Sequence, residues 1–112
     1  MLKRWWKKRW NVDYKIEYST NAIKSLEQIY DYISKVLFNT IAAENTINGI
    51  FAVINNLKLF PNMYAATKFY ISEKIPVHIA LYKNYRILYS VFDKDYTVVI
   101  YNIIISRQNY SN

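Results

Sequence analysis

Apolar and polar residues alternate with a period of two near the start of the chain and again over its last third. The sequence YKIEY at residues 14–18 places tyrosine and isoleucine on one side and charged residues on the other. This alternation is typical of a half-buried strand, because successive side chains of a strand point to opposite faces. After Pro76 the same period returns in three runs rich in β-branched and aromatic residues, at 77–82, 85–92 and 98–105. The short links between these runs predict a three-stranded antiparallel meander.

Between the first strand and the meander the apolar period lengthens to three and four residues. Two such stripes indicate two amphipathic helices. The first stripe comprises Ala22, Leu26, Ile29, Tyr30, Ile33 and Leu37, and the second comprises Ala43, Ile47, Ile50, Phe51, Ile54 and Leu57. Ser19 or Asn21 can cap the first helix, and the break near residues 38–40 is so short that the two helices must run antiparallel. Gly49 inside the second helix destabilises it by about 1 kcal/mol relative to alanine. We expect that the glycine is present because it allows the two helix backbones to approach each other closely.

The order of strand, helical hairpin and three strands predicts an α+β domain with the helices packed on one sheet face. Residues 61–75 show no clean period and are interpreted as a loop with room for a short strand. The other sheet face is expected to be exposed. We assign residues 12–112 to this single domain and residues 1–11, MLKRWWKKRWN, to a basic, tryptophan-rich extension.

The net charge of +7 is concentrated at the N-terminus. Residues 1–11 hold five of the 15 basic residues and no acid, so residues 12–112 carry 10 bases against 8 acids. The extension has three interpretations: a translation-start artefact with the true start at Val12, a solvated basic arm, or an element that binds a membrane interface or nucleic acid. Residues 58–112 hold seven bases and three acids, so an anionic partner is expected on the second half of the chain.

Composition excludes several classes of chemistry. With no cysteine and one glycine, the chain has no disulfide, no thiolate zinc site, no cysteine nucleophile, no P-loop and no dinucleotide-binding turn. A single histidine excludes a two-histidine metal site, so we expect neither metal nor cofactor. No apolar run is long enough to span a membrane. The sequence therefore predicts a soluble, cytoplasmic protein without a membrane partner.

A set of basic residues and tyrosines remains as candidate chemistry. Cleavage of RNA by its own 2′-hydroxyl needs a base, cations that stabilise the phosphorane and an acid for the leaving oxygen. These residue types permit that reaction without identifying it. The candidates are His78, Tyr82, Lys83, Arg86, Tyr89, Arg107 and Tyr110.

Several segments, taken in order, resemble one known family. They are YKIEYSTNAIKSLEQIYDYI, AAENTINGIFAVINNLKLFP, KNYRILYSVFD and VVIYNIIISRQNY. From about Tyr14 to Tyr110 the chain resembles toxins of bacterial type II toxin-antitoxin modules, the RelE/ParE superfamily. The resemblance implies a helical hairpin on an antiparallel sheet, a role in growth inhibition and plasmid stabilisation, and neutralisation by a cognate acidic antitoxin in a hetero-oligomer.

The superfamily divides between two activities. RelE-like members cut mRNA in the ribosomal A site, and ParE-like members poison DNA gyrase. The resemblance implies that Arg86 holds the scissile phosphate and that Arg107 stabilises the transition state. It also implies that Tyr110 takes part in proton transfer. His78 lies near a position where RelE-like nucleases carry lysine, and Lys83, Tyr82 and Tyr89 are candidate substrate-binding residues.

Three features of the sequence argue against the nuclease. Only one titratable residue lies near the lysine positions, and the spacing from Arg107 to Tyr110 is shorter than in the best nucleases of the group. The long hairpin at residues 19–60 is more like ParE. We favour ribosome-dependent mRNA cleavage, with the ribosome and mRNA as partners. Gyrase poisoning is the alternative, and a basic nucleic-acid-binding module is the third interpretation. For Arg86 itself, the alternative is a structural arginine that reaches a carboxylate from its strand.

Overall fold

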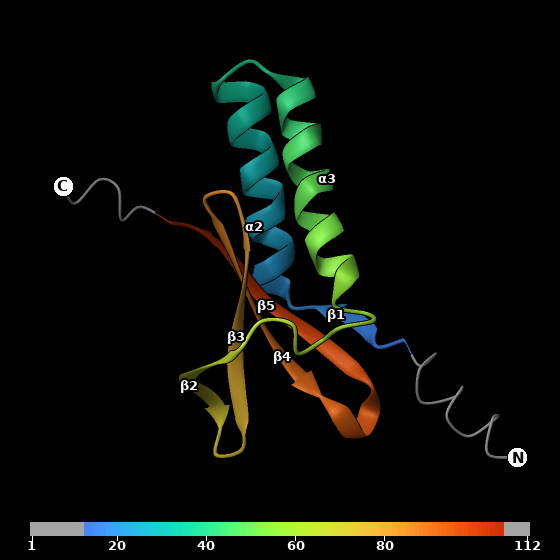
Figure 1. Ribbon diagram of the computed structural model, residues 1–112. Coiled ribbons are helices and arrows are strands. Elements are labelled where there is room, and N and C mark those ends of the chain that lie inside the picture. Colours follow the sequence, from blue (N-terminus) through green and yellow to red (C-terminus); the bar gives the residue numbers. More distant parts are fainter. Residues whose placement is uncertain (1–12, 107–112) are drawn as a thin grey trace, which may run out of the picture.

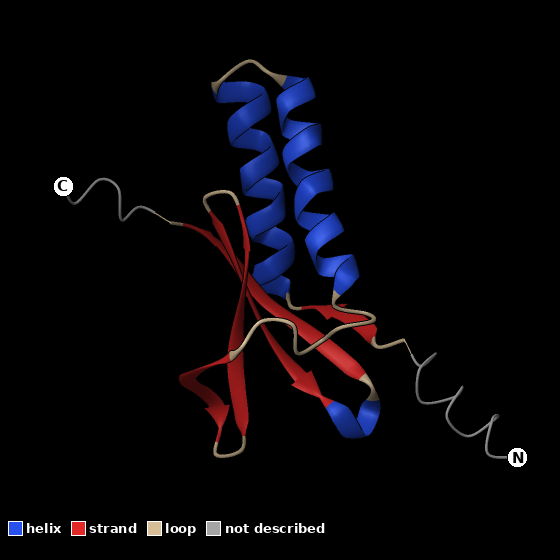
Figure 2. Ribbon diagram, in the orientation of Figure 1, coloured by secondary structure: helices blue, strands red, loops and turns tan. Residues whose placement is uncertain are grey.

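The protein is described by a computed structural model over residues 13–106. Two long helices stand on one end of a twisted five-stranded sheet (Figure 1), and the helical and sheet layers are coloured separately in Figure 2. The elements in chain order are β1 (Lys15–Tyr18), α2 (Thr20–Asp31), a π-helical turn (Tyr32–Val36), α3 (Thr40–Asn56), β2 (Ala66–Ser72), β3 (Ile75–Tyr82), β4 (Tyr85–Phe92), a 3₁₀ turn (Asp93–Asp95) and β5 (Thr97–Ile105).

The strands lie in the order β1-β5-β4-β3-β2. The strand β1 runs parallel to β5, and every other neighbouring pair is antiparallel. The predicted α+β class, with the helical hairpin on one face of the sheet, is confirmed. A further strand lies in the segment interpreted as a loop with room for a short strand: residues 66–72 pair with β3 in a register that shifts twice. Nearly every residue of β2 is exposed, so no alternation of polar and apolar residues marked this strand in the sequence.

Local signals set the bounds of both helices. The Ser19 hydroxyl caps α2 by accepting a hydrogen bond from the Ala22 N–H at 3.1 Å. The Asn39 side chain caps α3 in the same way, accepting from the Ala42 N–H at 2.9 Å. Each cap satisfies one of the N–H groups that a helix start leaves without a partner. The link between the helices turns at Phe38, whose φ of 54° lies in the left-handed region.

The hydrophobic core lies between the helices and one face of the sheet. The helices contribute Ala22, Ile50 and Ile54, followed by Leu57 at the end of α3. The sheet contributes Ala80, Ile87, Tyr89, Val98, Ile100 and Ile103. Below the hairpin, the chain after α3 continues across the same face (Figure 1), where the Pro61 carbonyl accepts a hydrogen bond from the Tyr89 hydroxyl at 2.8 Å. The hairpin and this loop together cover one side of the sheet.

Gly49 lies against an aromatic ring and not against the other helix. A Cβ atom built at Gly49 would overlap the ring of Tyr82 on β3. The expected close approach of the two helix backbones is therefore replaced by close approach of α3 to the sheet. Because Gly49 has no side chain, there is room for the Tyr82 ring, which is partly buried and packs against the core.

In a helix, alanine in place of glycine normally stabilises the folded protein by about 1 kcal/mol. For Gly49→Ala we expect no such increase in the free energy of unfolding, because the new methyl group must displace the Tyr82 ring. In a Tyr82→Ala background the same substitution should stabilise the protein, since the obstacle is gone. Urea unfolding of the four proteins in this double-mutant cycle measures the coupling, which should be at least about 1 kcal/mol. Additive effects would contradict the contact.

Candidate functional site

The pairing of β3 with β4 decides which face each candidate side chain reaches. His78 pairs with Tyr89, Ala80 with Ile87 and Leu81 with Arg86. Residues directly opposite in an antiparallel pair point to the same face, and neighbours along a strand point to opposite faces. Since Ala80, Ile87 and Tyr89 belong to the core, His78 lies on the helix-covered face and Arg86 on the open face.

The His78 imidazole is built into the core. It is 6% exposed, its Nδ1 lies 2.6 Å from the Tyr64 carbonyl oxygen, and its ring stacks on that of Tyr89 with centroids 5.0 Å apart. A carbonyl oxygen only accepts hydrogen bonds, so Nδ1 carries the proton and donates it. These contacts hold the loop after α3 against β3.

Tyr89 and Tyr82 lie on the same covered face. Tyr89 is fully buried, and burial raises the pKa of its hydroxyl to about 12. Tyr82 packs against Gly49 of α3, and the Lys83 ammonium lies over the Tyr82 ring at 5.5 Å from its centroid. Lys83 occupies the turn between β3 and β4 with φ of 51°. The two tyrosines thus serve packing, and Lys83 lies at the end of the sheet.

Arg86 is half-exposed and lies on the open face of the sheet, close to the turn that connects β3 to β4. Its cross-strand partners are Leu81 on β3 and Ile104 on β5, both of them exposed apolar side chains. Leu88, two residues along β4, shares this face. The structure therefore places Arg86 beside apolar cross-strand partners, with the sheet between it and His78.

Of the seven residues proposed from the sequence, five can be located. Arg107 and Tyr110 lie outside the described residues, so their relation to Arg86 stays a prediction. Among residues 13–106, no group of three His, Cys, Asp or Glu side chains could hold a metal ion. Within the same range, no helix is both long and apolar enough to cross a membrane.

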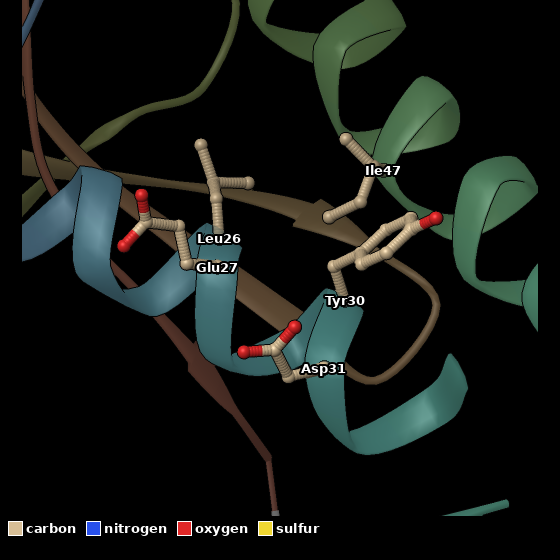
Figure 3. A pocket seen from close by; sticks show the side chains of 5 residues that line it. All are labelled: Leu26, Glu27, Tyr30, Asp31 and Ile47. Atoms are coloured by element: carbon tan, nitrogen blue, oxygen red, sulfur yellow. The ribbon is translucent and has the colours of Figure 1, made fainter. Parts of the chain in front are cut away.

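Two surface grooves flank α2, and the sequence analysis named neither. The first, of about 470 Å³, lies between α2 and α3 and is lined by Leu26, Glu27, Tyr30, Asp31 and Ile47. Figure 3 shows Tyr30 reaching toward Ile47, with the Glu27 and Asp31 carboxylates on the α2 side. The second, of about 580 Å³, lies between α2, the start of β4 and the end of β5. The apolar stripe predicts that Ile29 and Tyr30 are buried, whereas both are only half-buried. Their exposed parts line the two grooves.

A protein-family model described as the ParE toxin of the type II toxin-antitoxin system, parDE, matches residues 16–110. The chain belongs to this family. It is a toxin of a type II toxin-antitoxin system, as the resemblance to the RelE/ParE superfamily implied. No curated protein matches the sequence.

Solved structures share the fold of this ParE-family toxin at low identity. A chain of the chromosomal ParDE system of P. aeruginosa is 15% identical with a TM-score of 0.66, covering 87% of this chain and 100% of its own length. A chain of the RelBE2 toxin-antitoxin complex of Mycobacterium tuberculosis is 18% identical with a TM-score of 0.63, covering 85% and 93%. A chain of the archaeal RelE-RelB complex of Pyrococcus horikoshii OT3 is 16% identical with a TM-score of 0.61, covering 86% and 98%.

Tyr89→Phe is expected to destabilise the toxin by about 1 to 2 kcal/mol at pH 7, because it leaves the Pro61 carbonyl without its donor. The folded pKa of Tyr89 is raised to about 12 from 10.0, so the native state holds this proton more tightly than the unfolded state. The resulting stability is complete below pH 10 and is lost as the pH rises toward 12. Urea unfolding at several pH values should show a smaller alkaline loss for the variant; parallel curves for both proteins would contradict this account.

Proposed function

We propose that this toxin stops growth by binding DNA gyrase, the target of ParE-like members, and does not itself cut RNA. The observation that carries the proposal is the separation of His78 from Arg86 by the sheet. A general base has to reach the proton it removes, within about 3 Å or through one water. The buried imidazole, held by Tyr64 and Tyr89, cannot share a substrate with a guanidinium on the opposite face.

The surroundings of Arg86 support the same proposal. The side chains across from it on β3 and β5, Leu81 and Ile104, are apolar, and so is Leu88 two residues along β4. Such a surface suits contact with a protein better than it suits acid–base catalysis. The family model that matches the chain is that of the ParE toxin, which favours the gyrase-directed branch of the superfamily.

Ribosome-dependent mRNA cleavage, favoured on sequence grounds, remains the second candidate because Arg86 lies on the open face. There a guanidinium can hold a phosphate by two parallel hydrogen bonds. In this alternative Arg107 and Tyr110 would complete the site with Arg86, and His78 would have only a structural part.

We also propose a cognate antitoxin as the partner of this toxin. The support is that structural neighbours come from the RelBE2 and RelE-RelB complexes. The basic second half of the chain should attract an acidic segment, which gains buried area by adding a helix or a strand. The candidate contact surfaces are the exposed side of the helical hairpin and the sheet edge near residues 68–74.

The purified toxin is expected to inhibit supercoiling by gyrase and to leave mRNA uncut in a coupled translation reaction analysed by primer extension. The acidic protein of an adjacent reading frame, added before gyrase, should restore supercoiling because it occupies the toxin. Arg86→Ala is the matched variant for the alternative: in a nuclease it would abolish cleavage by removing a few kcal/mol of transition-state stabilisation. Cuts at A-site codons with unimpaired supercoiling would refute the gyrase proposal.

A further inference from the structure

The two helices meet at the end of the hairpin farthest from β1 (Figure 1), and this end carries exposed apolar side chains. We define the hairpin tip as residues 32–41, which span the π-helical turn, the link and the start of α3. Phe38 is 88% exposed and Ile41 72% exposed. The other exposed apolar or aromatic side chains of the tip are Tyr32, Val36 and Leu37. Five such side chains lie within ten residues, and a gathering of exposed apolar side chains is a feature of interaction sites.

Phe38 is a poor choice for stability at its position. Its φ of 54° puts it in the left-handed region, where the residue after a helix is usually glycine or asparagine, because a Cβ there is strained. The aromatic ring gains nothing from burial, since it projects into solvent. A sequence selected only for the fold would carry glycine or asparagine here. Departures from such local rules are expected at functional positions.

The backbone before Phe38 is also unusual. α2 widens into a π-helical turn at Tyr32–Val36, where the Leu37 N–H donates to the Tyr32 carbonyl at 3.1 Å. The Asn39 N–H then closes the helix end on the Ile33 carbonyl at 3.1 Å. Single π-helical turns are rare and occur frequently at functional sites. Together, the turn and the cap at Asn39 present Phe38 at the apex of the link.

The chemistry of the tip identifies the kind of partner. Its single charged residue, Lys35, lies 3.6 Å from the Asp31 carboxylate, so the tip offers little to a phosphate backbone. Because the tip is convex and apolar, it fits a concave apolar pocket on a protein. Tyr32 of the tip also lines the groove between α2 and β5, together with Ile104 and Ile105.

We propose that the hairpin tip enters an apolar pocket of the toxin's protein target, with Phe38 as the anchoring side chain. The inference rests on the proposed function, under which this target is gyrase. Aromatic side chains that fill a pocket at the centre of an interface commonly supply much of the binding energy.

The test compares Phe38→Asn with Phe60→Asn in the full chain, using purified gyrase as the probe. Phe60 is 61% exposed near the opposite end of α3, so it is an exposed phenylalanine that lies away from the tip. Asparagine tolerates the left-handed conformation, so Phe38→Asn should melt at or above the wild-type temperature. The toxin concentration for half-inhibition of supercoiling should rise about tenfold or more for Phe38→Asn and stay unchanged for Phe60→Asn.

Equal inhibition by Phe38→Asn and wild type would overturn the inference while leaving the gyrase proposal intact. Failure of the wild type to inhibit gyrase would refute the proposed function, and growth arrest in cells would then test the tip separately. In that assay, loss of arrest for Phe38→Asn but not for Phe60→Asn supports the tip as the target contact, and full arrest by both overturns it. A wild-type dimer in sedimentation that Phe38→Asn converts to monomer would also overturn it, because the tip would then bind a second copy.

Discussion

The antiparallel pairing between β3 and β4 is the constraint on which the rest of the structure depends. It places Ala80 opposite Ile87 and His78 opposite Tyr89 on the covered face, and Leu81 opposite Arg86 on the open face. A slip of one residue would exchange the two sets of side chains. The core under α3, the contacts of the loop after α3 and the separation of Arg86 from His78 all follow from this register.

The covered face of the sheet is closed by two different means. Near the β3–β4 turn, α3 packs on the sheet closely enough to need Gly49 beside Tyr82. Farther along, the loop after α3 replaces the helices and is held by two side-chain hydrogen bonds, from Tyr89 to Pro61 and from His78 to Tyr64. The Nδ1 atom of His78 and the hydroxyl of Tyr89 thereby have hydrogen-bond partners, as buried polar groups need. The hairpin is left with an apolar tip, which gives the toxin a contact surface separate from the sheet.

The periodicity of the sequence predicted the helical hairpin, the first strand and the meander, because each buries one face and exposes the other. At residues 61–75 it allowed only a loop with room for a short strand, because neither face of β2 is buried and its register is irregular. The faces of His78 and Arg86 could have been predicted. The expected two-residue turn at Lys83 and Asn84 sets Tyr82 opposite Tyr85 and therefore Leu81 opposite Arg86. His78, three residues before Leu81, must then point to the other face. The tip could not be predicted from the pattern, because Leu37 extended the apolar stripe of the first helix.

The most direct test of this account is the set of nuclear Overhauser contacts of the His78 ring, whose resonances are unambiguous because the chain holds one histidine. The account predicts contacts from the imidazole protons to the Tyr89 ring and to Tyr64, and none to Leu81 or Arg86. Contacts to the Leu81 methyl groups or to the Arg86 side chain would place His78 on the open face. That result would contradict the register and restore His78 as a candidate base beside Arg86.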